Sequence, residues 1–106
     1  MITVTIHRSN DSYAGFKVVG HAGYAEEGYD IICAAVSVLV VNTVNSIETF
    51  TDDKFAAHED HGIVELILEG SVSDKTTLLL DSMILGLRDI QTQYGNEFIR
   101  LKIEEV

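Results

Sequence analysis

Residues 20–37 read GHAGYAEEGYDIICAAVS, and within this stretch the hydrophobic pattern changes from that of a strand to that of a helix. The residues before it, 13–20, have the composition of a strand that ends at a glycine. The residues after it, 31–49, repeat apolar side chains at three- and four-residue steps, which predicts a helix with one broad apolar face. Asp30 stands immediately before that helix, and we expect its carboxylate to cap the first turn.

The other segments continue the same alternation of strands and helices. Strands are expected at residues 2–7, 13–20, 55–59, 63–69 and 99–104, turns at 9–12 and 58–62, and helices at 31–49 and from Ser73 or Asp74 to Tyr94. The order β-β-α-β-β-α-β predicts an α+β fold in which two helices pack on one face of a mainly antiparallel sheet. A chain of 106 residues is expected to form a single domain, residues 1–106. Gly86, inside the second helix, costs about 1 kcal/mol relative to alanine, which indicates close packing there.

The charge balance narrows the class of partner. The chain has 17 acidic and 7 basic side chains and a formal net charge of −10. Such a surface repels phosphate groups, so direct binding of nucleic acid or of an anionic membrane is disfavoured, whereas a basic protein is attracted. The apolar run from Ile31 to Val41 is interpreted as too short to span a bilayer. With one cysteine and no secretory signal pattern at the N-terminus, the expected compartment is the reducing cytoplasm.

His21 and Cys33 are placed to form a nucleophilic pair. The histidine is expected at the end of a strand and the cysteine at the third position of the helix, joined by a loop over residues 22–29. The thiolate is the reactive form, and a helix N-terminus favours it by roughly 0.3–1 kcal/mol. Since one pKa unit corresponds to about 1.4 kcal/mol, an imidazolium in contact has to supply the larger share. Asp30 has two open roles: its charge opposes the thiolate, or it orients His21 as a third member.

Three other functions are compatible with parts of this pattern. A lone cysteine in a small protein is more often a buried hydrophobic residue than a nucleophile, so the main alternative is a non-enzymatic acidic protein-binding module. A thiol-dependent acyltransferase or esterase would share the nucleophile, and a redox sensor lacks a second cysteine. The polar residues 58–61 are interpreted as a solvated turn rather than a metal site, and no metal or cofactor is expected.

The segment around these residues resembles the ribosomal-processing cysteine proteases of Gram-positive bacteria. The resemblance covers essentially the whole chain in length, element order and acidic character. Its motif residues are Gly20-His21-Ala22, Gly28, Asp30-Ile31 and Cys33-Ala34-Ala35-Val36-Ser37.

The resemblance implies a peptidase that removes an N-terminal extension from a large-subunit ribosomal protein of the bacterial L27 type. The family's histidine falls on His21, its nucleophile on Cys33 and its motif aspartate on Asp30. The implied substrate extension is hydrophobic, with aromatic residues before the scissile bond. The implied assembly is a homodimer, and the loop over residues 22–29 is implied to order around substrate. The alternative is a non-enzymatic acidic ribosome-assembly or protein-binding module. The substrate-binding candidates, chosen by the motif and by their positions, are Gly20, Ala22, Tyr24, Gly28 and Ser37.

Overall fold

The computed structural model describes residues 1–20, 29–60 and 62–106, with only the backbone described at Tyr29 and Asp30. The elements come in the order β1 (Ile2–Ser9), β2 (Ser12–Val19), α1 (Tyr29–Phe50), β3 (Lys54–Asp60), β4 (Ile63–Glu69), α2 (Asp74–Tyr94) and β5 (Ile99–Glu105). This is the order that the periodicity predicts.

The five strands form one sheet in the order β3-β4-β2-β1-β5. Three of the four strand pairs are antiparallel, and β1 with β5 is the parallel pair. The expectation of a mainly antiparallel sheet is therefore confirmed. Strands β3 and β5 are the two edges, so each has one row of backbone groups without a strand partner.

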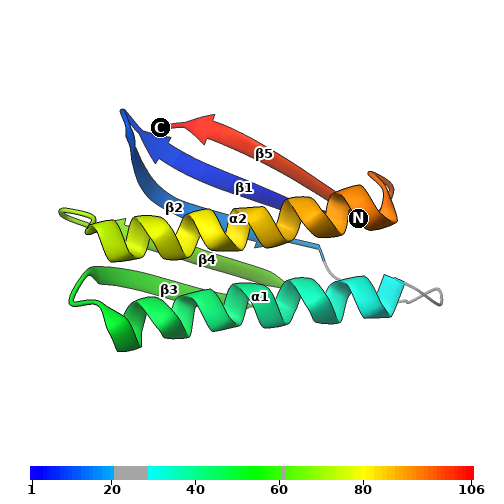
Figure 1. Ribbon diagram of the computed structural model, residues 1–106, viewed down its shortest axis with the longest axis horizontal. Coiled ribbons are helices and arrows are strands. Elements are labelled where there is room, and N and C mark those ends of the chain that lie inside the picture. The colour runs from blue at the N-terminus through cyan, green and yellow to red at the C-terminus, as the bar shows by residue number, and fades with distance from the viewer. Residues whose placement is uncertain (21–28, 61) are drawn as a thin grey trace.

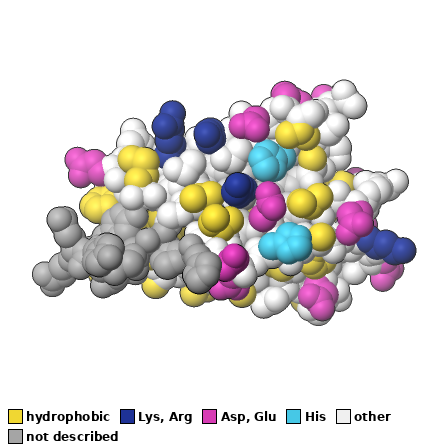
Figure 2. All heavy atoms as spheres, turned by 180° about the vertical axis from the view of Figure 1, so that it is seen from behind, with side chains coloured by type: hydrophobic (Ala, Val, Ile, Leu, Met, Phe, Trp, Pro, Cys, Tyr) yellow, Lys and Arg dark blue, Asp and Glu magenta, His cyan; other side chains and the backbone are white. Residues whose placement is uncertain are grey.

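Both helices lie on the same face of the sheet, with α1 on the β3 side and α2 beside it (Figure 1). The period of two in β1 sends Ile2, Val4 and Ile6 into the core between the helices and the sheet, where they are at most 1% exposed. The opposite face of the sheet has no helix over it among the described residues, and acidic, basic and histidine side chains are interspersed with hydrophobic ones there (Figure 2). The fold is thus a two-layer α+β sandwich, as predicted.

Helix α1 begins at Tyr29, two residues earlier than the predicted start at Ile31. Asp30 therefore belongs to its first turn and is not the residue that precedes the helix. The prediction that Asp30 is the N-cap is wrong, because the helical backbone continues through it. Cys33 is consequently the fifth residue of α1, beyond the first turn, where a backbone N–H has an intrahelical acceptor.

The apolar stretch of α1 continues beyond Val41, where the predicted run ends. Residues 31–50 have a mean hydropathy of 1.8, which by length and composition alone is enough to cross a membrane. The prediction concerns the run from Ile31 to Val41, which by itself is too short to span a bilayer; the helix that contains this run continues to Phe50. In the structure, its apolar content serves the core: Ile32, Val36, Val40 and Ile47 are at most 2% exposed against the sheet and α2.

The polar segment between β3 and β4 is shorter than expected. Strand β3 continues to Asp60, and the pairing of His58 with Glu65, Glu59 with Val64 and Asp60 with Ile63 replaces most of the predicted turn over 58–62. The turn prediction is wrong because these residues gain backbone hydrogen bonds from β4, while the exposed edge position tolerates their polar side chains. The turn at 9–12 is confirmed, with Asn10 at a φ of 58°.

Helix α2 is capped by Ser73, one of the two residues the sequence offers. The Ser73 hydroxyl accepts a hydrogen bond from the Thr76 N–H at 3.3 Å. At the other end, the Gly95 N–H donates to the Gln91 carbonyl at 2.8 Å. Gly86 packs against Leu39 of α1, since a Cβ at Gly86 would lie 2.7 Å from the Leu39 Cδ2 atom. The close packing that Gly86 predicts is thus the contact between the two helices.

Candidate active site

Cys33 lies near the N-terminal end of α1 and is 9% exposed. It belongs to the hydrophobic core, as a structural cysteine would. The Cys33 side chain also borders a pocket. The residue therefore combines burial with access to a space that a ligand can enter.

The pocket beside Cys33 has a volume of about 220 Å³. One wall is helix α1, because residues three and four apart share a helix face. That wall consists of Cys33, Val36, Ser37, Val40 and Val41. Three neighbouring strands supply the opposite wall through Ile2, Val18 and Val64. Apart from Ser37, these residues are apolar, and the space suits an apolar side chain of a ligand.

Ser37 stands one helical turn after Cys33 and lines the same pocket. It is exposed, so its hydroxyl is available to a ligand. The predicted spacing of Cys33 and Ser37 on one side of the helix is confirmed.

Two further residues that the sequence analysis did not single out as site residues reach the pocket. Glu59 of β3 and Gly62, just before β4, lie on its lining. Both fall within the predicted turn over residues 58–62. The sequence signal for these two residues is weak, because it depends on the strand pairing that brings Glu59 and Val64 to the same space as α1.

A shallower hollow adjoins this pocket along the same helix. It lies between α1, through Val41, Val44 and Asn45, and the edge strand β3, through residues 57–59. Val41, Glu59 and Val64 line both spaces. The described residues therefore form a continuous depression that runs from Cys33 along α1 beside the sheet edge.

Several predicted site residues lie outside the described residues. These are His21, Ala22, Tyr24 and Gly28. Gly20 is described: its φ is +82°, and a Cβ there would lie 2.5 Å from the Met1 carbonyl oxygen. A backbone reason therefore suffices for glycine at position 20.

The resolved pKa shifts among the described residues lie away from the pocket. Burial, followed by a hydrogen bond to Asp81, raises the pKa of Tyr13 to about 12. Hydrogen bonds from Thr76 and Ser73 hold the pKa of Asp53 below its ordinary value. Neither residue lines the pocket beside Cys33. Within the described ranges, no group of three or more His, Cys, Asp or Glu side chains is arranged to hold a metal ion.

Comparison with known proteins places this architecture in a family. Residues 1–99 match the model of the cysteine protease Prp family. The ribosomal processing cysteine protease Prp of Bacillus subtilis is 33% identical over 101 residues, covering 89% of this chain and 90% of that protein.

Solved structures agree. The essential ribosomal processing protease Prp from Staphylococcus aureus, crystallised with a substrate peptide, has a TM-score of 0.90 at 30% identity and covers 98% of this chain and 100% of its own. The same protease with a covalently linked product peptide has a TM-score of 0.87 at 31% identity, with the same coverage. Family model, relatives and fold agree over nearly the whole length, so this chain belongs to the cysteine protease Prp family.

Proposed function

We propose that this cysteine protease removes the N-terminal extension of a large-subunit ribosomal protein of the bacterial L27 type. The observation that carries the proposal is the position of Cys33 on the wall of an apolar pocket. The relatives are named as ribosomal processing proteases, and one of them holds a covalently linked product peptide. A thiol bordering an apolar pocket is suited to attack a peptide whose neighbouring side chain fills that pocket.

In the proposed mechanism, Cys33 and His21 act as a pair. His21 takes the proton of the Cys33 thiol, and the sulfur attacks the carbonyl carbon of the scissile bond. The tetrahedral intermediate collapses to a thioester while His21 returns the proton to the leaving amine. Water, deprotonated by His21, then hydrolyses the thioester and releases the thiol. No cofactor or metal takes part in these steps.

The remaining motif residues have supporting roles in this proposal. Asp30 orients His21. This role is open to Asp30 because the residue lies inside the first turn of α1 and is therefore not the residue that caps the helix. Ser37 contacts the substrate from the wall that it shares with Cys33. Gly20, Ala22, Tyr24 and Gly28 complete the substrate-binding set on the segment that precedes α1.

The test is intact-mass analysis of a ribosomal protein precursor after incubation with the protein. The wild type is expected to release one defined N-terminal fragment, and Cys33→Ser and His21→Ala are expected to lower the rate by at least about a hundredfold. His7→Ala is the matched control, because alternation from the buried Ile6 places His7 on the sheet face away from the helices. Cleavage that persists in Cys33→Ser would refute the mechanism. A complex without cleavage by the wild type would favour the protein-binding module.

We also propose that the protein is located in the cytoplasm. There it forms a homodimer through the outer face of α1. Residues 31–47 carry no charged side chain in a protein of net charge −10. On the outer face, Ile31 and Val38 are 62% and 69% exposed. A second copy can approach this neutral face without strong repulsion and bury it.

Sedimentation analysis tests the dimer. Val38→Asp places two opposed carboxylates in the interface and is expected to shift the protein to a monomer. Ile103→Asp on β5 is the control, since Ile103 is 51% exposed and lies on the far edge strand. A monomeric wild type, or a dimer that Ile103→Asp alone disrupts, would contradict this interface.

A further inference from the structure

Glu59 occupies an unusual position for a charged residue. In β3, the cross-strand partners of Phe55, Ala57 and Glu59 are Leu68, Leu66 and Val64. Directly opposed residues of neighbouring strands share one face of the sheet, and Leu66 is fully buried under the helices. Glu59 therefore lies on the helix-covered face, where the pattern of β3 and β4 otherwise places apolar residues.

The position of Glu59 also brings it to the pocket of Cys33. Both residues line the same space of about 220 Å³, and Glu59 is the charged residue among the described lining residues. It is exposed, so its carboxylate is accessible to a ligand. Glu59 lines both hollows together with Val41, which lies eight residues after Cys33 on α1, or about 12 Å along the helix axis. Since an extended peptide advances about 3.3 Å per residue, Glu59 can reach a substrate side chain within about four residues of the bond that Cys33 attacks.

A carboxylate at this place makes a chemical distinction between substrates. The walls of the pocket are mainly apolar and select no charge, whereas a carboxylate at its lining attracts a lysine or arginine side chain through a charge-assisted hydrogen bond. The net charge of −10 draws a basic protein to the molecule from any direction. A single carboxylate on the pocket that Cys33 borders adds a preference for where along the peptide that positive charge lies.

We propose that Glu59 is a specificity-determining residue that binds a lysine or arginine side chain of the substrate within about four residues of the scissile bond. The proposal rests on the proposed peptidase function. The competing structural explanation is that Glu59 guards an edge strand, since inward-pointing charges on edge strands prevent pairing with other chains. The two explanations differ in what a Glu59 variant does to substrate choice.

The experiment compares peptides that carry the scissile sequence and differ at one position. Lysine is placed in turn at each of about four positions on either side of the scissile bond, with norleucine as the uncharged reference of similar length. With wild-type protein, lysine is expected to raise kcat/KM about tenfold over norleucine at one position, which corresponds to about 1.4 kcal/mol. Glu59→Gln is expected to abolish this preference, and Glu59→Lys to transfer it to a glutamate peptide at the same position.

Glu65→Gln is the matched control. It removes the same charge from the neighbouring strand, but Glu65 pairs with His58 on the sheet face opposite the helices, the face seen in Figure 2. It is expected to leave the lysine preference intact. A lysine preference that survives in Glu59→Gln, or that Glu65→Gln removes equally, would overturn the proposal while leaving the peptidase function standing. Failure of the wild type to cleave any peptide would instead refute the proposed function.

Discussion

Two glycines with similar backbone φ angles differ in how much space their surroundings leave for a side chain. Gly20 and Gly70 have φ values of +82° and +78°, but only Gly20 has backbone atoms close to where a Cβ would stand. Gly70→Ala is expected to cost about 1–2 kcal/mol of unfolding free energy, from backbone strain alone. Gly20→Ala adds a clash with the Met1 carbonyl oxygen, which no side-chain rotation relieves, and is expected to cost at least about 1 kcal/mol more. Urea denaturation followed by circular dichroism measures both, and equal losses would contradict the steric argument.

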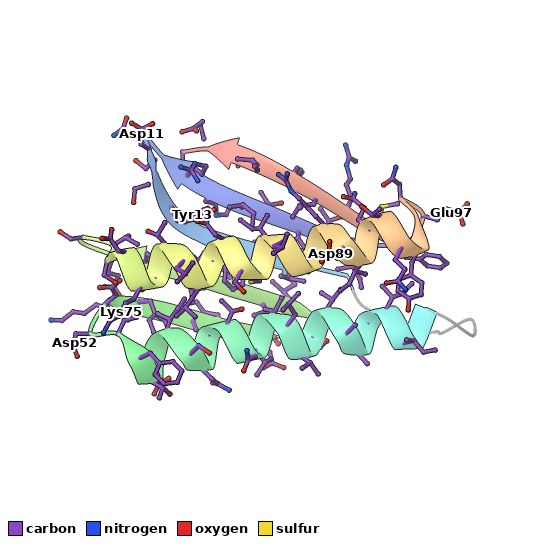
Figure 3. The ribbon with its side chains drawn as sticks, in the orientation of Figure 1. Asp11, Tyr13, Asp52, Lys75, Asp89 and Glu97 are labelled. Carbon is purple, nitrogen blue, oxygen red and sulfur yellow. The ribbon has the colours of Figure 1, made fainter. Side chains whose placement is uncertain are left out.

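Tyr13 gives the stability of the protein a dependence on alkaline pH. It points from β2 towards α2 (Figure 3), where its hydroxyl donates to Asp81, and the Arg8 guanidinium lies 4.6 Å from its ring centre. Burial and this hydrogen bond raise its pKa from 10.0 to about 12, so the folded protein favours the neutral phenol. The associated stability is complete below pH 10 and is lost as the pH rises towards 12.

Tyr13→Phe removes this titration. Between about pH 9.5 and 11.5 the wild type is expected to lose about 1–2 kcal/mol more unfolding free energy than Tyr13→Phe does. Urea denaturation at a series of pH values provides the comparison, and the other tyrosines and the lysines cancel between the two proteins. Parallel profiles would show that Tyr13 does not carry the effect.

At the scale of elements, the packing of α1 on α2 turns on Gly86. A Cβ at this position would meet the terminal methyl groups of Leu39, at 2.7 and 3.3 Å. Gly86→Ala gains about 1 kcal/mol of helix propensity, and the Leu39 side chain can rotate to make room, so the net change is expected to stay within about 1 kcal/mol of zero. Gly86→Val brings a larger, branched side chain that separates the helices, at an expected cost of about 1–3 kcal/mol. If the alanine variant were as unstable as the valine variant, Leu39 would have to be immovable.

For the whole molecule, the net charge of −10 opposes compaction through mutual repulsion. Raising NaCl from about 20 mM to about 500 mM, which shortens the Debye length to a few ångströms, is therefore expected to raise Tm by a few degrees. The double variant Glu48→Lys, Glu97→Lys changes the net charge from −10 to −6, because each substitution adds two charge units. It is expected to show a smaller salt effect in the same thermal scans. An unchanged salt effect would mean that general ion effects, not self-repulsion, set the response.

The sequence by itself determined the elements of this protein and their order. The spacing of apolar residues is a local property: its period is two in residues 2–7 and three to four in residues 31–49. Either period places the apolar residues on one face, and that face is buried wherever the segment packs. The same holds for Ser73 as the cap of α2, since its partner Thr76 is only three residues away. The placement of Cys33 and Ser37 on one side of a helix likewise follows from spacing alone.

Only the tertiary structure decided the strand order β3-β4-β2-β1-β5 and the parallel pairing of the two terminal strands. It also decided that the polar residues 58–60 extend an edge strand and that Glu59 faces the pocket of Cys33. These features depend on pairings between segments distant in the chain, whose backbone hydrogen bonds and shared burial override the local turn preference of polar residues. The wall of the candidate site that faces α1 comes from β1, β2, β3 and β4, and their arrangement is a property of the whole fold.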